Sequence, residues 1–206
     1  MTTLQLLSIE GIRDQGSGIR DQGSGIRDQG SGIGGFEDPC SVRIRTADAD
    51  DAAAIHALIV EHLAEGHLLP RERGEIAVHA HRFVIAVQGG ETVACAALAP
   101  LGRSVAEVRS LVVSREARHV GIGRRLIDEL LRRATAAGFD TLCAFTHAPG
   151  YFTHLGFSIV PPAWLPEKIG TDCHSCRLFR RCEQYAVIRS LERPRHACVP
   201  LAALHG

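Results

Sequence analysis

The sequence lacks the features that would assign it to a membrane-spanning, secreted or nucleic-acid-binding class. None of its apolar runs reaches the roughly 18–20 residues that a membrane-spanning helix needs. The first ten residues contain neither a basic region nor an apolar stretch long enough for a signal peptide. The formal net charge is +0, so no excess of basic charge indicates a polyanionic partner. We therefore expect a cytoplasmic protein with no membrane and no nucleic-acid partner.

The cysteines do not indicate a disulfide framework. There are seven of them in 206 residues, and an odd number in a cytoplasmic protein favours free thiols. Cys95 and Cys143 lie inside apolar, strand-like runs, so we predict that they are buried and behave as small hydrophobic residues.

Three further cysteines cluster near the carboxyl end of the sequence, at Cys173, Cys176 and Cys182. A structural zinc site needs four ligands, and His174 is adjacent to Cys173, which is poor geometry for the fourth. A remote ligand such as His154 or His196 is left open. We expect no bound metal, and we predict that these thiols are buried in a loop on the substrate side.

The first 40 residues differ in composition from the rest. Residues 11–31 are three copies of the heptapeptide GIRDQGS, each with two glycines and one apolar residue. This pattern does not fit a coiled coil, because two glycines per repeat would destabilise a helix by roughly 2 kcal/mol relative to alanine. We predict a disordered tail over residues 1–40, one folded domain over 41–192 and a carboxyl-terminal extension over 193–206.

The hydrophobic pattern of the folded part alternates between strand and helix periods. Strands are predicted over residues 42–45, 83–87, 92–100, 104–113, 141–146, 158–160 and 185–191. Helices are predicted over about 53–63, 71–80, 122–134 and 150–155. Gly89 and Gly90 are typical of a tight hairpin turn, and Gly138 is typical of a helix stop. The order βααβββαβαβ predicts an α/β (mixed α+β) fold with a central mixed sheet flanked by helices.

The motif Arg118-x-x-Gly121-x-Gly123 lies between a predicted strand and a predicted helix. Glycines let a backbone approach a ligand closely, and the first N–H groups of a helix lack internal acceptors and attract anions. Arg124 and Arg125 add positive charge at the same place. The motif indicates a pyrophosphate site, although a strand-to-helix turn with surface arginines would show the same pattern.

This motif resembles the coenzyme A signature of the GNAT acetyltransferase superfamily. A second segment, Gly150-Tyr151-Phe152-Thr153-His154-Leu155-Gly156-Phe157, resembles the family's aromatic-x-x-LGF helix and turn. The resemblance implies the GNAT fold and acetyl-CoA as the co-substrate. The cofactor-binding residues that it implies are Leu111, Val112, Val113, Arg118, His119, Val120, Gly121, Ile122, Gly123, Arg124 and Phe152.

A closer resemblance, over roughly residues 42–190, is to the acetyltransferase domain of bacterial N-acetylglutamate synthases. It is carried by AEVRSLVV at 106–113, the LGF turn, LPEK at 165–168, Asp172-Cys173-x-x-Cys176 and Cys182-Glu183-x-x-Ala186. It implies transfer of acetyl to the α-amino group of an amino acid, with L-glutamate as the leading candidate. Acetylation of glutamate is the first step of arginine biosynthesis. The resemblance includes no amino-acid-kinase domain, which implies a short, stand-alone form without arginine feedback through such a domain.

The resemblance also suggests roles for individual side chains. Glu107 is the expected general base, because an α-amino group is mostly protonated at pH 7. In the family, a tyrosine that acts as general acid occupies the position of Phe152. Tyr151, about 100° away on the helix, is therefore the candidate acid here. Phe152 is expected near the pantetheine arm. Arg109 is two residues from Glu107 on the same predicted strand, so the two side chains point to one face. Lys168 is expected in a loop. Arg109 and Lys168 are the candidate partners of the glutamate carboxylates.

Two alternatives are left open. One is a GNAT enzyme that acts on another small amine. The other is a non-catalytic module that binds acetyl-CoA or zinc and regulates a partner. A homodimer is also left open as the assembly.

Overall fold

A computed structural model describes residues 41–66, 68–176 and 179–191. In this part of the chain the strands are β1 (Arg43–Thr46), β2 (Phe83–Gln88), β3 (Glu91–Pro100), β4 (Val105–Val113), β5 (Thr141–Thr146), β6 (Ser158–Val160) and β7 (Tyr185–Ser190). The helices are α1 (Ala52–His62), α2 (Arg73–Val78), α3 (Ile122–Ala136), α4 (Pro149–Thr153) and α5 (Pro166–Lys168). The predicted tail and carboxyl-terminal extension lie outside the described residues.

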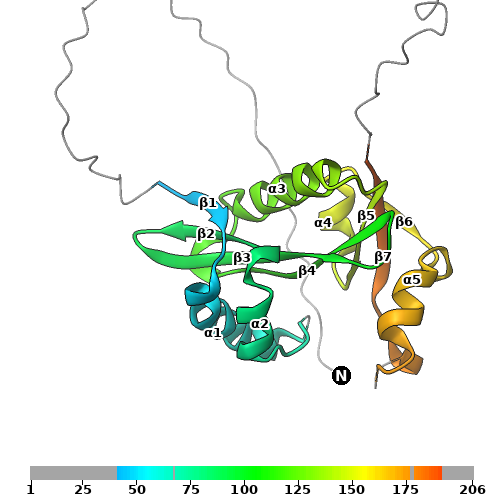
Figure 1. Ribbon diagram of the computed structural model, residues 1–206, viewed down its shortest axis with the longest axis horizontal. Helices are drawn as coiled ribbons and strands as arrows, with labels where there is room; N and C mark the ends of the chain where they lie inside the picture. The colour runs from blue at the N-terminus through cyan, green and yellow to red at the C-terminus, as the bar shows by residue number, and fades with distance from the viewer. Residues whose placement is uncertain (1–40, 67, 177–178, 192–206) are drawn as a thin grey trace, which may run out of the picture. The chain divides into compact units, whose positions relative to one another are not determined.

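The strands form one mixed seven-stranded sheet in the order β1-β2-β3-β4-β5-β7-β6. Neighbouring strands are antiparallel except β4 and β5, which are parallel and are joined through the crossover helix α3. Helix α3 covers one face of the sheet, and α1 and α2 cover the other (Figure 1). The prediction of a mixed sheet flanked by helices is confirmed.

Each face of the sheet has its own hydrophobic core. On one face, the apolar stripe of α3 (Ile122, Leu126, Ile127, Leu130 and Ala134) is buried against β2–β5. On the other face, Ile55 and Ile59 of α1 pack with Ile85 of β2 and Val112 of β4. Strand β4 lies between the two cores, which fixes it in position from both sides. Among the described residues, no helix has the length and apolar composition required to cross a membrane.

The two helices nearest the predicted cofactor site end in the same type of cap. After α3, Gly138 has φ +82°, and the N–H of Phe139 donates to the carbonyl of Ala134 at 3.1 Å. After α4, the N–H of Phe157 donates to the carbonyl of Phe152 at 3.1 Å, and the two rings pack edge to face. This is a Schellman cap with its usual hydrophobic contact, and it explains why the LGF turn contains a glycine followed by an aromatic residue.

One helical segment is not predicted by the sequence pattern. Residues 162–173 form a 3₁₀ turn at Pro162–Trp164, helix α5 and a π-helical turn at Ile169–Cys173. Pro162 and Pro166 are the reason, because proline in the first turn starts a helix and costs no hydrogen bond there. Lys168 therefore lies on a helix, and the expectation that it lies in a loop is wrong.

Candidate functional site

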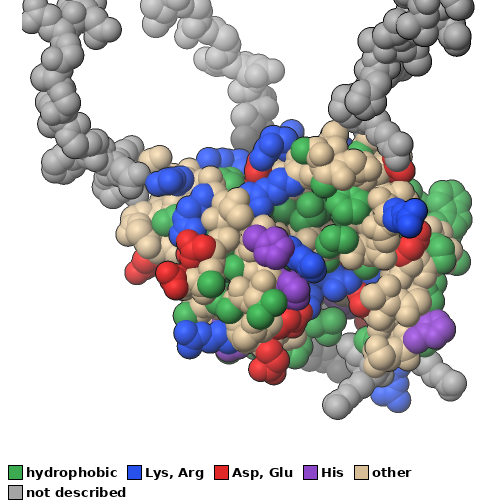
Figure 2. All heavy atoms as spheres, in the orientation of Figure 1, with side chains coloured by type: hydrophobic (Ala, Val, Ile, Leu, Met, Phe, Trp, Pro, Cys, Tyr) green, Lys and Arg blue, Asp and Glu red, His purple; other side chains and the backbone are tan. Residues whose placement is uncertain are grey.

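Strands β4 and β5 diverge, and the candidate site lies where they separate. In the described structure they pair only over Val105–Glu107 and Thr141–Cys143, although β4 continues to Val113 and β5 to Thr146. A cleft of about 1260 Å³ opens there and is lined by both strands, by the start of α3 and by the segment that follows α5. On the face shown in Figure 2, basic and histidine side chains gather at the hollow between the α1–α2 side and the α5 side.

A bulge in β4 determines which side chains face which core. Ala97 pairs with Arg109 and Cys95 pairs with Val112, so β4 has one more residue than β3 in this interval. Ser110 adopts φ +51°, and its carbonyl accepts a hydrogen bond from the Cys95 thiol at 3.5 Å. After the bulge, the backbone of Leu111–Val113 runs along the cleft and pairs with β3 on one side, with no β5 partner on the other in the described structure. Polar backbone groups on that second side can bind a ligand.

The start of α3 has the features of an anion site at one end of the cleft. Gly121 is the N-cap with φ +82°, and the described residues supply neither a side-chain cap nor an acidic residue in the first turn. Arg124 and Arg125 occupy that first turn instead, where the helix dipole disfavours cations unless an anion is bound. His119 and Val120 are exposed on the loop, while Ile122 is buried and anchors it. The geometry fits a pyrophosphate.

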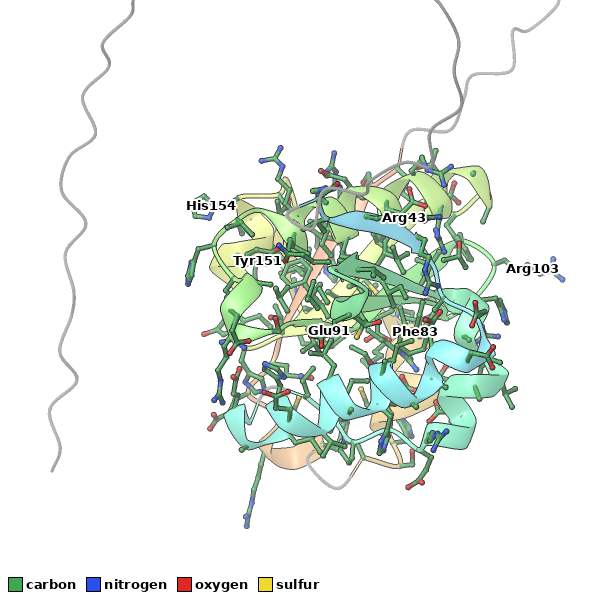
Figure 3. All side chains as sticks on the ribbon, turned by 90° about the vertical axis from the view of Figure 1, so that its left-hand side faces the viewer. Arg43, Phe83, Glu91, Arg103, Tyr151 and His154 are labelled. Carbon is green, nitrogen blue, oxygen red and sulfur yellow. The ribbon has the colours of Figure 1, made fainter. Side chains whose placement is uncertain are left out.

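Gly123 is surrounded more tightly than the other residues of this loop. A Cβ at this position would lie 2.6 Å from the Tyr151 hydroxyl oxygen. Burial, with the charge of Asp128, raises the pKa of Tyr151, so its phenol remains a proton donor. Phe152 is buried, and its ring packs edge to face on Tyr151 at 5.5 Å. Tyr151 points inward, whereas His154 of the same turn points outward (Figure 3). The structure thus brings Tyr151 to the glycine loop.

Arg118 is oriented by contacts that the sequence did not reveal. Its Nε donates to the Val113 carbonyl at 3.1 Å, and its Nη2 donates to both carboxylate oxygens of Glu65 at 2.9 Å. The hydrogen bond from Arg118, helped by Arg115 and opposed by burial, lowers the pKa of Glu65. Glu65 follows α1 and has no distinguishing motif in the sequence. Its contact with Arg118 links the α1 side of the cleft to the predicted cofactor loop.

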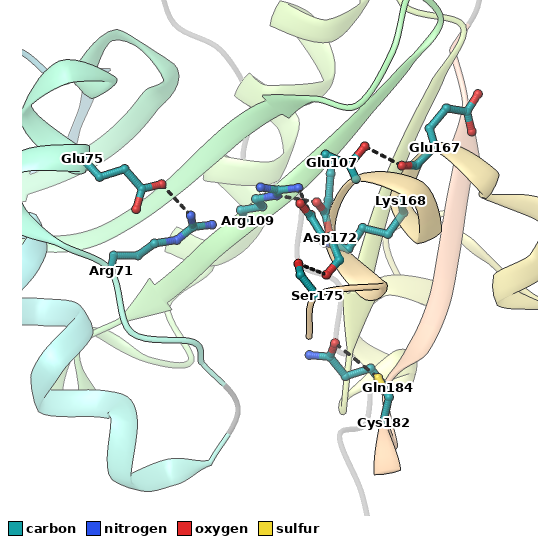
Figure 4. A network of polar contacts seen from close by, with 11 residues as sticks. Arg71, Glu75, Glu107, Arg109, Glu167, Lys168, Asp172, Ser175, Cys182 and Gln184 are labelled. Carbon is teal, nitrogen blue, oxygen red and sulfur yellow. Dashed lines mark hydrogen bonds and ion pairs between the residues drawn. The ribbon is translucent and has the colours of Figure 1, made fainter. Parts of the chain in front are cut away.

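The opposite end of the cleft contains a closed set of four charged side chains, which we call the ionic ring: Glu107, Arg109, Lys168 and Asp172 (Figure 4). Lys168 Nζ lies 2.6 Å from Glu107 Oε1 and 2.8 Å from Asp172 Oδ2. Arg109 contacts Glu107 through Nε and Asp172 through Nη2. The prediction that Glu107 and Arg109 share one face of β4 is confirmed.

Lys168 stands out within the ring. It is the only lysine of the chain; every other basic residue among the 23 lysines and arginines is an arginine. Its ammonium also lies 5.3 Å from the centre of the Phe145 ring, a cation–π distance. Lysine presents a compact point charge, and here that charge contacts the carboxylates of both Glu107 and Asp172.

Two further charged residues at this end of the cleft are not singled out by the sequence pattern. Arg71 lines the cleft and forms an ion pair with Glu75 at 2.8 Å. Asp172 belongs to the Asp172-Cys173-x-x-Cys176 segment, and its contacts with Arg109 and Lys168 emerge only in the structure. Burial would raise the pKa of Asp172, but the hydrogen bond from Lys168 and the charges of Lys168, Arg109 and Arg71 outweigh it and lower the pKa.

The cysteine cluster lines the same end of the cleft, but the prediction that it is buried is wrong. Cys173 and Cys176 are half-buried and Cys182 is exposed, and all three line the cleft. Within the described residues, no group of three or more His, Cys, Asp or Glu side chains is arranged to hold a metal ion. His196 lies outside the described residues.

The chain belongs to the GNAT acetyltransferase family. The model of the Acetyltransferase (GNAT) family matches residues 47–157, more than half of the chain. An uncharacterized N-acetyltransferase from Chlorobaculum tepidum is 30% identical over 148 residues, which cover 72% of this chain and 96% of that protein. Use of acetyl-CoA is typical of this family, and the loop geometry described above fits it.

Amino-acid acetyltransferases are more distant relatives. The enzyme from Neisseria meningitidis is 32% identical over 136 residues, which cover 65% of this chain and 31% of that protein. The solved structure of N-acetylglutamate synthase from Neisseria gonorrhoeae, complexed with coenzyme A and N-acetyl-glutamate, is 29% identical with a TM-score of 0.68. The aligned region covers 75% of this chain and 36% of the synthase chain. This chain therefore spans about a third of the length of both the N. meningitidis enzyme and the N. gonorrhoeae synthase.

The glycine loop yields the first prediction. Gly121→Asp and Gly123→Glu should abolish acetyl-CoA binding, measured by calorimetry, because each places a side chain and a negative charge at the anion site. Gly138→Asp is the matched control, since Gly138 has the same φ of +82° at the other end of α3 and is not among the residues that line the cleft. Normal affinity in both loop variants, with thermal melting showing that they are folded, would contradict the assignment.

The second prediction concerns Cys143, which pairs with Glu107 across β4 and β5. Burial, reinforced by the negative charge of Glu107, raises the pKa of Cys143 to about 12. At pH 8 roughly one thiol in ten thousand is then ionised, so Cys143 is a poor nucleophile and its reactivity rises only as pH approaches 12. Iodoacetamide at pH 8 should modify Cys182 and leave Cys143 unmodified in the folded protein, as read by peptide mass spectrometry. Full modification of Cys143 without unfolding would refute this.

Proposed function

We propose that this chain transfers the acetyl group of acetyl-CoA to the α-amino group of an amino acid, with L-glutamate as the first candidate. The observation that carries the proposal is the position of Glu107. The residue is 2% exposed, and its carboxylate lies at the opposite end of the cleft from the glycine loop, in contact with two cations. A buried carboxylate is a suitable proton acceptor for an amine, and cations beside it suit an acceptor that carries carboxylates.

Membership of the GNAT family and the geometry of the glycine loop support the assignment of the cofactor end. Acetyl-CoA supplies the acetyl group as an activated thioester. The N–H groups at the start of α3 and the side chain of Arg124 would hold the pyrophosphate. The backbone of Leu111–Val113, on the side that has no β5 partner in the described structure, would hold the pantetheine arm. Arg118 would join them once it exchanges the carboxylate of Glu65 for a phosphate.

Proton transfer is assigned to two side chains. Glu107 would accept the proton that the acceptor amine must lose, and its burial excludes competing water. Tyr151 would donate a proton to the departing thiolate, which its raised pKa and its position at the glycine loop support. Phe152 would form the apolar wall beneath the pantetheine arm, since its ring is packed between those of Tyr151 and Phe157.

The acceptor end would bind carboxylates through Arg109 and Lys168, with Arg71 as a third cation on the wall of the cleft. Two carboxylates of glutamate need cationic partners, because burying an unpaired carboxylate costs several kcal/mol. The similarity to amino-acid acetyltransferases and to the synthase complexed with N-acetyl-glutamate supports this acceptor, and with it a role in arginine biosynthesis. The competing function is acetylation of another small amine by the same site.

The role of Glu107 gives the third prediction. Glu107→Gln should lower kcat for glutamate by about 100-fold or more at neutral pH, since a positioned base contributes roughly 10²–10⁴-fold. The loss should shrink as pH rises, because the amine then deprotonates without help. Initial rates of thiol release from acetyl-CoA between pH 6.5 and 9.5 measure both effects. A variant with wild-type kcat and an unchanged pH profile would rule out the base.

Lys168 gives the fourth prediction. Lys168→Ala should raise the KM for glutamate at least about tenfold, or roughly 1.4 kcal/mol, and leave acetyl-CoA affinity unchanged. Lys168→Arg, which keeps the charge, should lose less. Arg103→Ala is the control for total charge, because Arg103 is exposed and points away from the molecule (Figure 3). An unchanged KM for glutamate in Lys168→Ala would remove Lys168 from the acceptor site.

A further inference from the structure

Asp172 is bound in the way that a carboxylate ligand would be. One oxygen, Oδ2, accepts from Lys168 Nζ at 2.8 Å and also contacts Arg109 Nη2. These are the same two cations that contact Glu107. The bridging position between a guanidinium and an ammonium is therefore occupied by a carboxylate of the chain itself (Figure 4).

Asp172 is the outermost member of the ionic ring. The exposed fraction of the side chain is 3% for Glu107, 14% for Lys168, 21% for Arg109 and 31% for Asp172. Glu107 is fixed within the sheet, whereas Asp172 lies on the π-helical turn Ile169–Cys173. Such turns are rare and are frequent at functional sites, and this one places its carboxylate on the wall of the cleft. A ligand that enters the cleft reaches Asp172 before Glu107.

The two cations do not depend on Asp172 for their position. Both are already bonded to Glu107, and Lys168 also packs over Phe145. The two positive charges of the ring equal its two negative charges, so its net charge is zero. An acceptor carboxylate that gains a cation in this ring competes with Asp172 and not with Glu107, because Asp172 is the more exposed of the two carboxylates and Glu107 lies deeper.

We propose that Asp172 occupies the subsite for the acceptor's carboxylate and is displaced by it, so that Asp172 determines how strongly the site prefers carboxylate-bearing amines. This inference rests on the proposed function. Asp172 acts as an internal competitor that holds Arg109 and Lys168 until an acceptor arrives. Removing its charge leaves one positive charge of the ring without a partner and available to the acceptor.

The test compares glutamate with its diamide, which has the same amine and no carboxylate. Asp172→Asn should lower the KM for glutamate at least about threefold and change the KM for the diamide by less than twofold. The KM for acetyl-CoA should not change. Asp172→Ser provides a second uncharged variant if the first is poorly folded, and Asp172→Glu, which keeps the charge, should retain the higher KM of the wild type.

Glu167→Gln is the matched control, because it removes one negative charge from the neighbouring helix α5 and Glu167 has no ion pair to the ring among the described contacts. If this control lowers the KM for glutamate as much as Asp172→Asn does, the effect is general electrostatics and the inference fails. It also fails if both Asp172 variants raise the KM for glutamate and diamide alike. A wild type that acetylates other amines but not glutamate refutes the proposed function, and this inference with it, before any variant is made.

Discussion

The buried carboxylate of Glu107 is the constraint on which the acceptor end of this molecule depends. The Glu107 side chain is 3% exposed, and its charge needs cationic partners because an unpaired buried charge costs several kcal/mol. Arg109 comes from the same strand, but Lys168 comes from a helix 61 positions further along the chain. The ion pair between Glu107 and Lys168 therefore attaches the α5 segment to β4, at the last β4 residue that pairs with β5. The same contact places charged groups on the wall of the cleft.

The other end of the cleft depends on the path of β4. Because β4 leaves β5 after Glu107, its remaining backbone faces the cleft, and the bulge at Ser110 keeps Arg109 and Val112 on one side of the sheet. The same strand then leads into the glycine loop at the start of α3. A single strand thus connects the proposed base, the backbone groups that face the cleft and the proposed anion site. This order suits an amine, a thioester and a pyrophosphate.

Much of this arrangement could be predicted from local sequence patterns. The glycine loop, the amphipathic face of α3 and the LGF cap each depend on residues within a few positions of one another, and each was recovered. The phase shared by Glu107 and Arg109 follows from strand alternation, although it does not reveal that Glu107 is buried.

The contacts that were missed join distant segments. Glu65 meets Arg118 over 53 positions, and Asp172 meets Arg109 over 63 positions. No local period encodes such a pairing. The helical turns around Lys168 are not predicted either. Proline breaks a helix in its interior but favours the first turn of a helix, so Pro166 alone does not tell whether a helix ends or begins there.

The most direct test of the central claim is a steady-state acceptor screen with the purified chain, acetyl-CoA and a thiol-release readout. The panel should contain glutamate, glutamine, a polyamine and a peptide with a free amino terminus. The ionic ring predicts the highest kcat/KM for glutamate, with glutamine weaker because it lacks one carboxylate. Activity on the polyamine or the peptide with none on glutamate or glutamine would contradict the account, leaving only membership of the GNAT family.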